Sequence, residues 1–288
     1  MHLIRFGAPG EERPGIILAD GARIDASGFG GDYDEAFFGG DGLSRLAAWV
    51  ERNGARAPRV DAGVRLGPAA CRPSKLVCVG LNYHEHAREQ GVQPPREPIL
   101  FLKSTSSFCG PNDDLRLPRG STKTDWEVEL AVVIGRMARY VPKAEALGHV
   151  AGYALFNDYS EREYQLERGG QWDKGKGCDT FAPFGPFIAT ADGIDARNLK
   201  MWLTVNGVRK QDSTTADMIF DVPTLVSYIS EFMTLLPGDI ISTGTPPGVG
   251  AYAKPPQFLR AGDVVELGIE GLSQSRQKVI AHEEVRAR

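Results

Sequence analysis

The sequence predicts an α+β fold in which a small N-terminal domain precedes a larger, β-rich domain. Three observations support this prediction. From Lys75 onward, short aliphatic and β-branched runs alternate with glycine and proline, which is typical of many short strands. Only a few stretches of the same region have helical character. Residues 1 to about 70 differ, with a glycine-rich loop and one clear helix.

The N-terminal part is predicted to begin with a short strand. A glycine-rich loop follows at residues 28–42, then a helix at residues 43–52 and a connector rich in proline and glycine that ends at Pro73. This part is too small, and has too few distinctive polar residues, to contain the active site. We therefore assign residues 1–70 to a small N-terminal domain and residues 71–288 to the domain that carries the function.

Seven strands are expected in the larger domain, at residues 76–80, 99–103, 128–135, 150–156, 201–205, 239–243 and 264–269. Three helices are expected between them, at residues 83–90, 159–167 and 222–234. The last helix has Pro223 near its first turn, a position that tolerates proline because the amide there has no intrahelical partner. Strands therefore outnumber helices in this domain.

The composition indicates a globular protein that binds a small molecule. The chain has 288 residues, of which 42% are hydrophobic and 24% charged. Its net charge of −4 is spread without a basic block, so no nucleic acid and no anionic membrane surface is expected as a partner. The four cysteines form no CxxC pair, and no apolar run approaches the roughly 18 to 20 residues that span a bilayer. The N-terminus lacks a signal-peptide core, so we expect a cytoplasmic protein with reduced thiols.

Alternating acidic residues precede the apolar run at residues 130–134. In a strand, Asp125, Glu127 and Glu129 would share one face, and residues two apart lie roughly 6.5 to 7 Å apart along it. Both glutamates could then bind one cation, which would relieve their mutual repulsion next to apolar residues. The alternative is the solvated outer face of an amphipathic strand.

Asp158 follows the predicted strand at residues 150–156. An acidic residue at the exit of a buried strand is held in place while it stays accessible, which suits a metal ligand or a catalytic group. The alternative is a helix N-cap for the segment that follows.

His86 and Glu89 lie three residues apart in a predicted helix and therefore share one face. A carboxylate in that position holds an imidazole in one tautomer and raises its basicity, as in a general base. His84 lies off this face and is expected to play no part. The alternative is an ordinary surface helix rich in histidine and glutamate.

Two further segments, residues 169–179 and 242–250, are rich in glycine. Backbone amides at glycine can approach an anionic ligand closely, and lysine and threonine side chains add donors. Neither segment has the spacing of a P-loop or of a dinucleotide fingerprint. Ordinary turns are the alternative for each.

Taken in order, six motifs resemble those of the fumarylacetoacetate hydrolase family. They are Val79-Gly80-Leu81-Asn82-Tyr83 with His86, Phe101-Leu102-Lys103, Asp125 with Glu127 and Glu129, Asn157-Asp158, Lys176, and Ser242-Thr243-Gly244-Thr245-Pro246. The resemblance covers residues 72 to 280. A chance match to six family motifs in the same order is far less probable than a chance match to any single motif.

The resemblance implies a mixed β-sandwich or β-roll catalytic domain, usually in a homodimer, with one Mg²⁺ or Mn²⁺. It also implies a lid at residues 83–91. Carried over by position, the metal ligands are Glu127, Glu129 and Asp158, the catalytic residues are His86, Glu89 and Lys176, and the substrate-binding residues are Gln165, Lys176 and Thr245.

Residues 167–172, 211–214 and 238–250 are similar to bacterial members that hydrolyse 2,4-dioxo-3-deoxy-L-rhamnonate or L-fuconate to pyruvate and lactate, and whose close relatives are often labelled ureidoglycolate lyase. One departure is Cys178, close after Lys176 where many relatives carry a serine. The expected function is metal-dependent hydrolysis of a C–C bond in a 2,4-dioxo acid. The alternatives are a ureidoglycolate lyase, an acylpyruvate hydrolase, an oxaloacetate decarboxylase, or a non-catalytic protein that binds a metal or an oxo acid.

The expected mechanism joins the metal to a general base. The carboxylate and 2-oxo oxygen of a small 2-oxo acid would chelate the metal, while His86, oriented by Glu89, takes a proton from a water that attacks the 4-carbonyl. Polar groups near Gln171, Trp172 and Asp212 are expected to contact a hydroxylated tail. A non-catalytic binding protein would need the carboxylates but not the histidine and glutamate pair, so the presence of both favours an enzyme.

Overall fold

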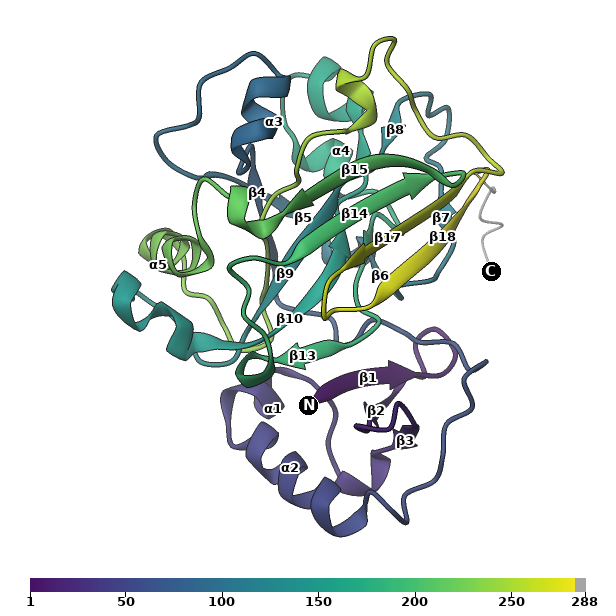
Figure 1. Cartoon of the computed structure of the whole chain (residues 1–288), viewed down its shortest axis with the longest axis vertical. Coiled ribbons are helices and arrows are strands. Elements are labelled where there is room, and N and C mark those ends of the chain that lie inside the picture. Colours follow the sequence, from purple (N-terminus) through teal and green to yellow (C-terminus); the bar gives the residue numbers. More distant parts are fainter. Residues whose placement is uncertain (283–288) are drawn as a thin grey trace.

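The computed structural model describes residues 1–282 and confirms the α+β fold. Two sheets form its body, and the smaller one lies against the central strands of the larger one (Figure 1). All seven strands expected from the sequence are present, with bounds that differ by no more than a residue or so at each end.

The larger sheet has nine strands in the order β3-β2-β1-β13-β10-β9-β16-β4-β5. Neighbouring strands are antiparallel apart from β16 and β4, which are parallel. The strands are β1 (His2–Phe6), β2 (Arg13–Ile17), β3 (Arg23–Asp25), β4 (Leu76–Gly80), β5 (Ile99–Lys103), β9 (Val128–Ile134), β10 (Val150–Asn157), β13 (Ile188–Thr190) and β16 (Ile240–Ser242).

The smaller sheet has five strands in the order β15-β14-β17-β18-β7. They are β7 (Leu115–Arg116), β14 (Lys200–Val205), β15 (Val208–Thr214), β17 (Val264–Ile269) and β18 (Gln274–Ile280). Two short pairs complete the strands: β6 (Phe108–Cys109) with β12 (Ala182–Pro183), and β8 (Thr124–Asp125) with β11 (Ser160–Glu161).

The N-terminal strands continue the larger sheet, because β1 pairs with β13 at His2 and Ala189. Helices α1 (Glu35–Gly39) and α2 (Gly42–Asn53) follow them and lie at the bottom of Figure 1. The sequence predicts one strand and an open loop at residues 28–42, whereas the structure has three strands and places α1 inside that loop. The pairing of β1 with β13 depends on residues about 185 positions away in the sequence, so a local sequence pattern cannot predict it.

The core lies on both faces of β9. Val128, Leu130 and Val132 pack with residues of the smaller sheet such as Leu203 and Leu267. Ala131 and Val133 of β9 pack on the other face with residues of the N-terminal helices such as Phe37 and Leu46. Burial on both faces explains why the strand is apolar from Leu130 to Ile134 instead of alternating with polar residues.

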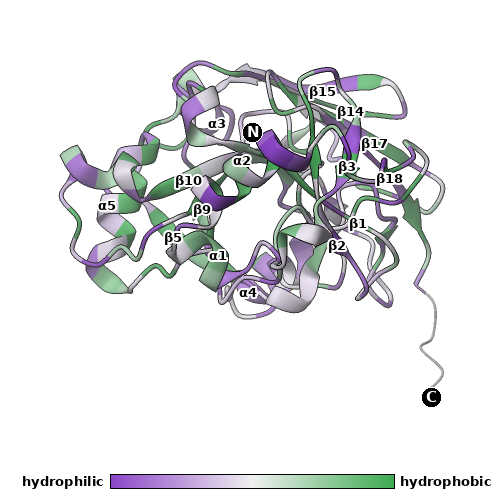
Figure 2. Ribbon diagram, turned by 90° about the horizontal axis from the view of Figure 1, so that it is seen from below, coloured by the Kyte–Doolittle hydropathy of each residue, from purple (hydrophilic) through white to green (hydrophobic). Residues whose placement is uncertain are grey.

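Two of the three helices expected in the larger domain are present, as α3 (His84–Glu89) and α5 (Val222–Phe232). Figure 2 shows hydrophobic and hydrophilic segments along α5, in keeping with one buried face. The helix expected at residues 159–167 is wrong in its first half, because Ser160 pairs with Asp125 to form β11 and β8. A single π-helical turn, η4 (Glu163–Glu167), follows.

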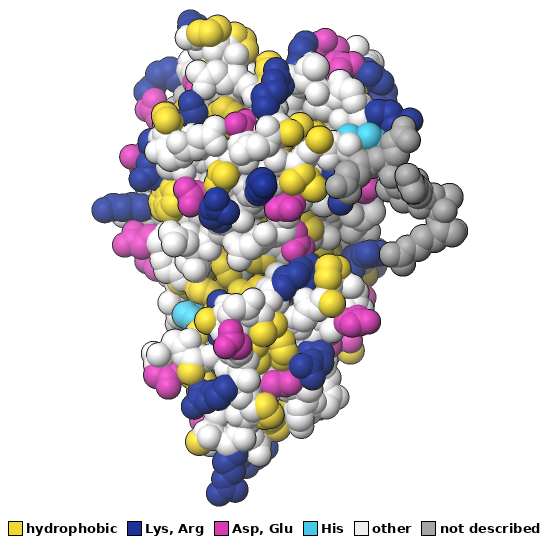
Figure 3. All heavy atoms as spheres, turned by 90° about the vertical axis from the view of Figure 1, so that its right-hand side faces the viewer, with side chains coloured by type: hydrophobic (Ala, Val, Ile, Leu, Met, Phe, Trp, Pro, Cys, Tyr) yellow, Lys and Arg dark blue, Asp and Glu magenta, His cyan; other side chains and the backbone are white. Residues whose placement is uncertain are grey.

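The remaining helical segments are short. They are α4 (Asp173–Lys176) and the 3-10 turns η1 (Ser27–Phe29), η2 (Thr105–Ser107), η3 (Lys143–His149), η5 (Ala191–Gly193), η6 (Thr215–Asp217) and η7 (Gly250–Tyr252). Within residues 1–282, no helix combines the length and apolar character needed to cross a bilayer. On the face shown in Figure 3, acidic and basic side chains are interspersed, without a block of one sign.

Candidate functional site

Three carboxylates meet where β9 and β10 lie side by side. One ligand atom from each of Glu127, Glu129 and Asp158 lies within 4.8 Å of the others. The antiparallel register pairs Phe156 with Glu129, so the chain leaving β10 passes Glu127, and the amide of Asp158 donates to the Glu127 carbonyl at 2.9 Å. The pairing of two strands thus brings Asp158 to the two glutamates.

Burial excludes the alternative roles of these carboxylates. Glu127, Glu129 and Asp158 are 6%, 1% and 0% exposed, so they do not form a solvated strand face. Asp158 caps no helix, because its two carboxylate oxygens accept from lysine side chains.

Asp125 does not join this cluster, although it precedes Glu127 by two residues. Its carboxylate accepts from the backbone amides of Gly250 at 2.6 Å and Ala251 at 2.9 Å, and from Arg162 Nε at 2.8 Å. The strand is interrupted between β8 and β9, so the simple alternation of faces does not hold across this break. Asp125 instead fixes η7 and Arg162 relative to each other.

Three buried cations neutralise the carboxylates. Lys176 Nζ lies 2.6 Å from Glu127 Oε2 and 2.9 Å from Asp158 Oδ2. Lys103 Nζ lies 2.6 Å from the other oxygen of Asp158. Arg162 Nη2 lies 2.7 Å from Glu127 Oε1. Together with Asp125, the site has four buried carboxylates and three buried cations within residues 1–282, which leaves one net negative charge when all are ionised.

Lys103 and Arg162 were not assigned a role from the sequence. Lys103 is the last residue of one motif of the family resemblance and lies at the end of β5, beside β4. These two features could have identified it as a residue of the site. Arg162 had no such signal. It reaches Glu127 only because β11 turns the chain back across β8.

The ionisation of the glutamates reflects their surroundings. Burial, and then the charges of Asp158 and Glu127, raise the pKa of Glu129 well above its ordinary value. Burial also opposes the ionisation of Glu127, but Lys176 and Arg162 outweigh it and hold the pKa of that carboxyl below its ordinary value. Glu129 is therefore the carboxylate with the most to gain from a cation that is not part of the chain.

The cluster fits a hard divalent cation. Its three ligands are carboxylate oxygens, the donors that Mg²⁺ and Mn²⁺ prefer. Glu129 Oε1 has no hydrogen-bond partner among residues 1–282, whereas its Oε2 accepts from Ser242 Oγ at 2.6 Å and from the amide of Gly244 at 2.9 Å. A carboxylate oxygen has two lone pairs, so the lysine contacts of Glu127 and Asp158 leave room for a cation.

His86 is held in one orientation by its neighbours on α3. Its Nδ1 lies 2.8 Å from Glu89 Oε2, and its Nε2 lies 2.8 Å from Gln90 Nε2. Glu89 accepts at its other oxygen from the amide of Gly248 at 2.9 Å. Nδ1 therefore donates to the carboxylate, and the lone pair of Nε2 accepts from the Gln90 amide. His84 is exposed and stands apart.

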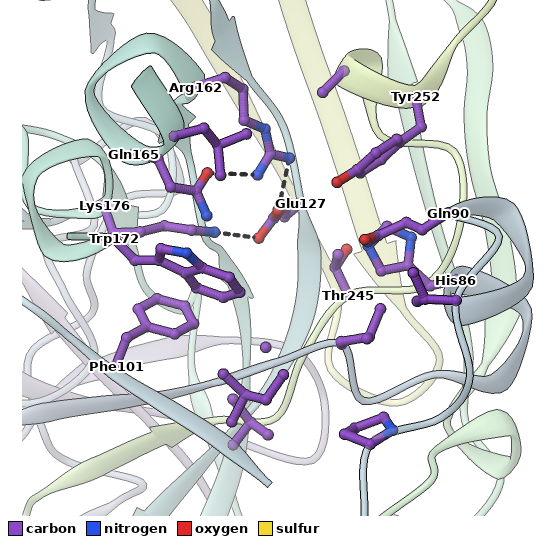
Figure 4. Close-up of a pocket in the computed structure, with 18 of the residues that line it drawn as sticks. His86, Gln90, Phe101, Glu127, Arg162, Gln165, Trp172, Lys176, Thr245 and Tyr252 are labelled. Carbon is purple, nitrogen blue, oxygen red and sulfur yellow. Dashed lines mark hydrogen bonds and ion pairs between the residues drawn. The ribbon is translucent and has the colours of Figure 1, made fainter. Parts of the chain in front are cut away.

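A cavity of about 470 Å³ joins the carboxylates to α3. In Figure 4, Lys176, Gln165 and Trp172 lie on one wall, and His86, Gln90 and Tyr252 lie on the facing wall, with Glu127 between them. The cavity thus has cations and an amide opposite a histidine, with acidic ligands at its base.

The two residues assigned only to substrate binding differ in what they offer. Gln165 accepts from Arg162 Nη1 at 3.0 Å through its Oε1, which leaves its NH₂ group to donate into the cavity. Thr245 Oγ1 donates to the Val128 carbonyl at 3.0 Å and accepts from Gln211 Nε2 at 2.8 Å. The hydroxyl proton of Thr245 is therefore already used within the protein.

The expectation of polar contacts near Gln171 and Asp212 is wrong. Of the three residues concerned, only Trp172 lines the cavity, while Gln171 borders a separate surface hollow. Gln211 is completely buried, so Asp212, its neighbour on β15, points outward. The cavity lining away from the charged groups is instead mostly apolar, and includes Val79, Val92, Pro95, Ile99, Phe101 and Leu166.

Cys178 lies close after Lys176 and is half-buried. Burial raises the pKa of its thiol to about 11. The thiol is therefore protonated near neutral pH, which gives it little nucleophilic character.

Comparisons with known proteins agree on one family. A family profile described as "Fumarylacetoacetate (FAA) hydrolase C-terminal" matches residues 75–280. A protein from Burkholderia multivorans is 51% identical over 279 residues, covering 96% of this chain and 98% of that protein.

Solved structures agree with this match. A fumarylacetoacetate hydrolase from Exiguobacterium antarcticum has a TM-score of 0.84 and 35% identity, covering 98% of this chain and all of that one. A maleylpyruvate hydrolase from Sphingobium, solved in complex with manganese and pyruvate, has a TM-score of 0.81 and 30% identity, with coverage of 98% and 100%.

Proposed function

The chain belongs to the fumarylacetoacetate hydrolase family, and from this premise we propose that it hydrolyses the bond between C3 and C4 of a 2,4-dioxo acid. The observation that carries the proposal is the placing of two groups across one cavity. Glu127 and Glu129 of the buried three-carboxylate cluster line the cavity, and so does His86, which Glu89 orients on α3. A protein that only bound a metal or an oxo acid would need the first group and not the second.

Glu127, Glu129 and Asp158 would hold the divalent cation. When bound, such a cation supplies a Lewis acid and a chelating centre for the carboxylate and the 2-oxo oxygen of the substrate. With all four carboxylates ionised and Lys103, Arg162 and Lys176 beside them, the cation would change the site from one net negative charge to one net positive charge. A positively charged site favours an anionic 2-oxo acid over a neutral molecule.

His86 would remove a proton from the attacking water. Glu89 accepts a hydrogen bond from the Nδ1–H group, so the basic lone pair lies on Nε2 of His86, a residue that lines the cavity. Gln90 now donates to that lone pair at 2.8 Å, so its amide must give way to the water during the reaction. The water oxygen ends in the new carboxylate at C4, and a proton ends on C3 of the departing pyruvate.

The facing wall would stabilise the negative charge that develops on the 4-oxygen. Lys176 and the free NH₂ group of Gln165 line the cavity opposite His86, with the Arg162 guanidinium beside them (Figure 4). Fixed donors aimed at a developing oxyanion are effective because they need no reorganisation in the transition state. Lys176 would contribute most, since Asp158 and Glu127 outweigh the effect of burial and raise its pKa, which keeps it charged.

Within this reaction class, our proposed substrate is 2,4-dioxo-3-deoxy-L-rhamnonate or L-fuconate, cleaved to pyruvate and lactate. The support is the similarity of residues 167–172, 211–214 and 238–250 to enzymes of those substrates. The cavity lining adds a second argument, since its only lysine and arginine within residues 1–282, Lys176 and Arg162, both contact Glu127. A substrate with a second carboxylate at its far end would find no cation there, whereas a short tail with one hydroxyl and one methyl group would fit.

Pyruvate release from a panel of substrates tests the proposal. At equal enzyme concentration, the deoxysugar acid should be cleaved faster than acetylpyruvate, fumarylacetoacetate or oxaloacetate. Ureidoglycolate, assayed by glyoxylate release, tests the lyase alternative. A clear preference for ureidoglycolate, or metal and oxo-acid binding with no turnover of any substrate, would contradict the proposed function.

A further inference from the structure

Tyr252 presents a free hydroxyl to the cavity. It is the last residue of η7, and its ring makes an edge contact with the His86 ring at a centroid distance of 5.9 Å. Figure 4 shows the hydroxyl pointing into the cavity, toward the side where Glu127 lies. The hydroxyl makes no hydrogen bond to any part of the chain that the structure describes. Tyr252 is 39% exposed and lines the cavity.

The backbone that precedes Tyr252 is fixed. The amides of Gly250 and Ala251 donate to the two oxygens of Asp125, which is itself held by Arg162. Arg162 also contacts Glu127 at 2.7 Å, so one network links the position of η7 to the acidic cluster. The backbone that carries Tyr252 is therefore set in place before a ligand binds, which lowers the entropy that a hydrogen bond to the ligand would cost.

Several other neutral polar groups of the cavity already have partners within the protein, and the free NH₂ group of Gln165 lies on the wall opposite His86. Gln90 bonds to His86, Thr245 bonds to Val128 and Gln211, and the Gln165 oxygen bonds to Arg162. Gln93 is polar too, but it is exposed at the outer edge. On the wall that carries His86, the Tyr252 hydroxyl and the Gln90 side-chain oxygen are thus the polar groups left for a ligand within residues 1–282, and of the two only the hydroxyl can both donate and accept.

We propose that Tyr252 is a specificity-determining residue whose hydroxyl hydrogen-bonds a hydroxyl group on C5 of the substrate. The inference rests on the proposed function. C4 must lie within reach of a water on His86 Nε2, and C5 is bonded to C4 on the side away from the metal ligands. A substituent on C5 therefore lies beside the aromatic ring that packs against His86.

The test uses two substrates that differ in one hydroxyl. They are 5-hydroxy-2,4-dioxohexanoate, which is the deoxysugar acid, and 2,4-dioxohexanoate, which lacks only the C5 hydroxyl. Tyr252→Phe should lower kcat/KM for the hydroxylated acid by about 3- to 10-fold, the usual effect of losing one uncharged hydrogen bond. The value for 2,4-dioxohexanoate should stay within about 2-fold of the wild type, because that substrate has no partner for the hydroxyl.

Tyr140→Phe is the matched control, since Tyr140 is 67% exposed and lies outside the cavity. It should leave both substrates unaffected. An equal loss with both acids would place Tyr252 at the reacting carbon and overturn the inference, as would no loss with either. If the wild type cleaves both acids and Tyr252→Phe shows the same preference between them, the inference is wrong and the proposed function stands. If the wild type cleaves neither acid, the proposed function is wrong as well.

Discussion

Lys103 Nζ lies 2.6 Å from Asp158 Oδ1, and both side chains are completely buried. The same ammonium donates to the Tyr159 carbonyl at 3.0 Å. A lysine in this position neutralises one proposed metal ligand from behind, while Lys176 contacts the other oxygen of the same carboxylate. The positive charge of Lys103 therefore offsets part of the negative charge of the carboxylates, and the metal would offset the rest.

Lys103→Met should destabilise the metal-free protein by about 3 kcal/mol, because removing one partner of a buried pair leaves a carboxylate with less compensation. The loss should be smaller with saturating Mg²⁺ or Mn²⁺, since a bound cation supplies charge to the same carboxylates. Urea unfolding with EDTA and with metal measures both values. Lys123→Met is the control, because Lys123 pairs with Glu167 on the surface, and it should behave alike in the two conditions. An equal loss for Lys103→Met with and without metal would separate Lys103 from the metal site.

Removing the metal should abolish turnover, and Mg²⁺ or Mn²⁺ should restore it. Glu129→Ala should weaken metal binding without unfolding the protein, because it removes the carboxylate whose Oε1 has no partner within residues 1–282. Calorimetric titration with Mn²⁺ measures the affinity. Glu231→Ala, at an exposed position of α5, should leave the affinity unchanged. Full activity in a sample shown to be free of metal would end this interpretation.

His86→Ala should lower kcat by about 10²- to 10⁴-fold, the range expected for loss of a general base. His84→Ala changes the same helix at an exposed position and should have a much smaller effect. Steady-state kinetics with the best substrate of the panel compares the two variants. Similar losses in both would show that the pair of His86 and Glu89 does not act as the base.

Asp221→Ala should destabilise the protein by about 1 kcal/mol. Asp221 caps α5, because its Oδ1 accepts from the amide of Thr224 at 3.0 Å. Asp221→Asn keeps this acceptor but loses the exposed ion pair with Lys143, so it should be close to the wild type. Thermal and urea unfolding measure both variants. A larger loss for asparagine than for alanine would assign the effect to the ion pair and not to the cap.

Local patterns in the sequence determined the strands and the spacing of the candidate groups. The apolar run after Glu129 predicted most of β9, because a strand that packs on both faces is largely apolar. The three-residue spacing of His86 and Glu89 predicted their contact, since residues three apart share one face of a helix. Both inferences depend on residues within one turn or one strand, where backbone geometry fixes the distances.

Tertiary structure alone decided which charges surround the carboxylates and what lines the cavity. Lys103, Arg162 and Asp158 come from β5, the end of β11 and the end of β10, and only the order of strands in space brings them to Glu127 and Glu129. The outward direction of Asp212 likewise follows from the burial of Gln211, which no local pattern fixed. Contacts between distant segments depend on how whole strands pair and pack, and a sequence read segment by segment does not contain that information.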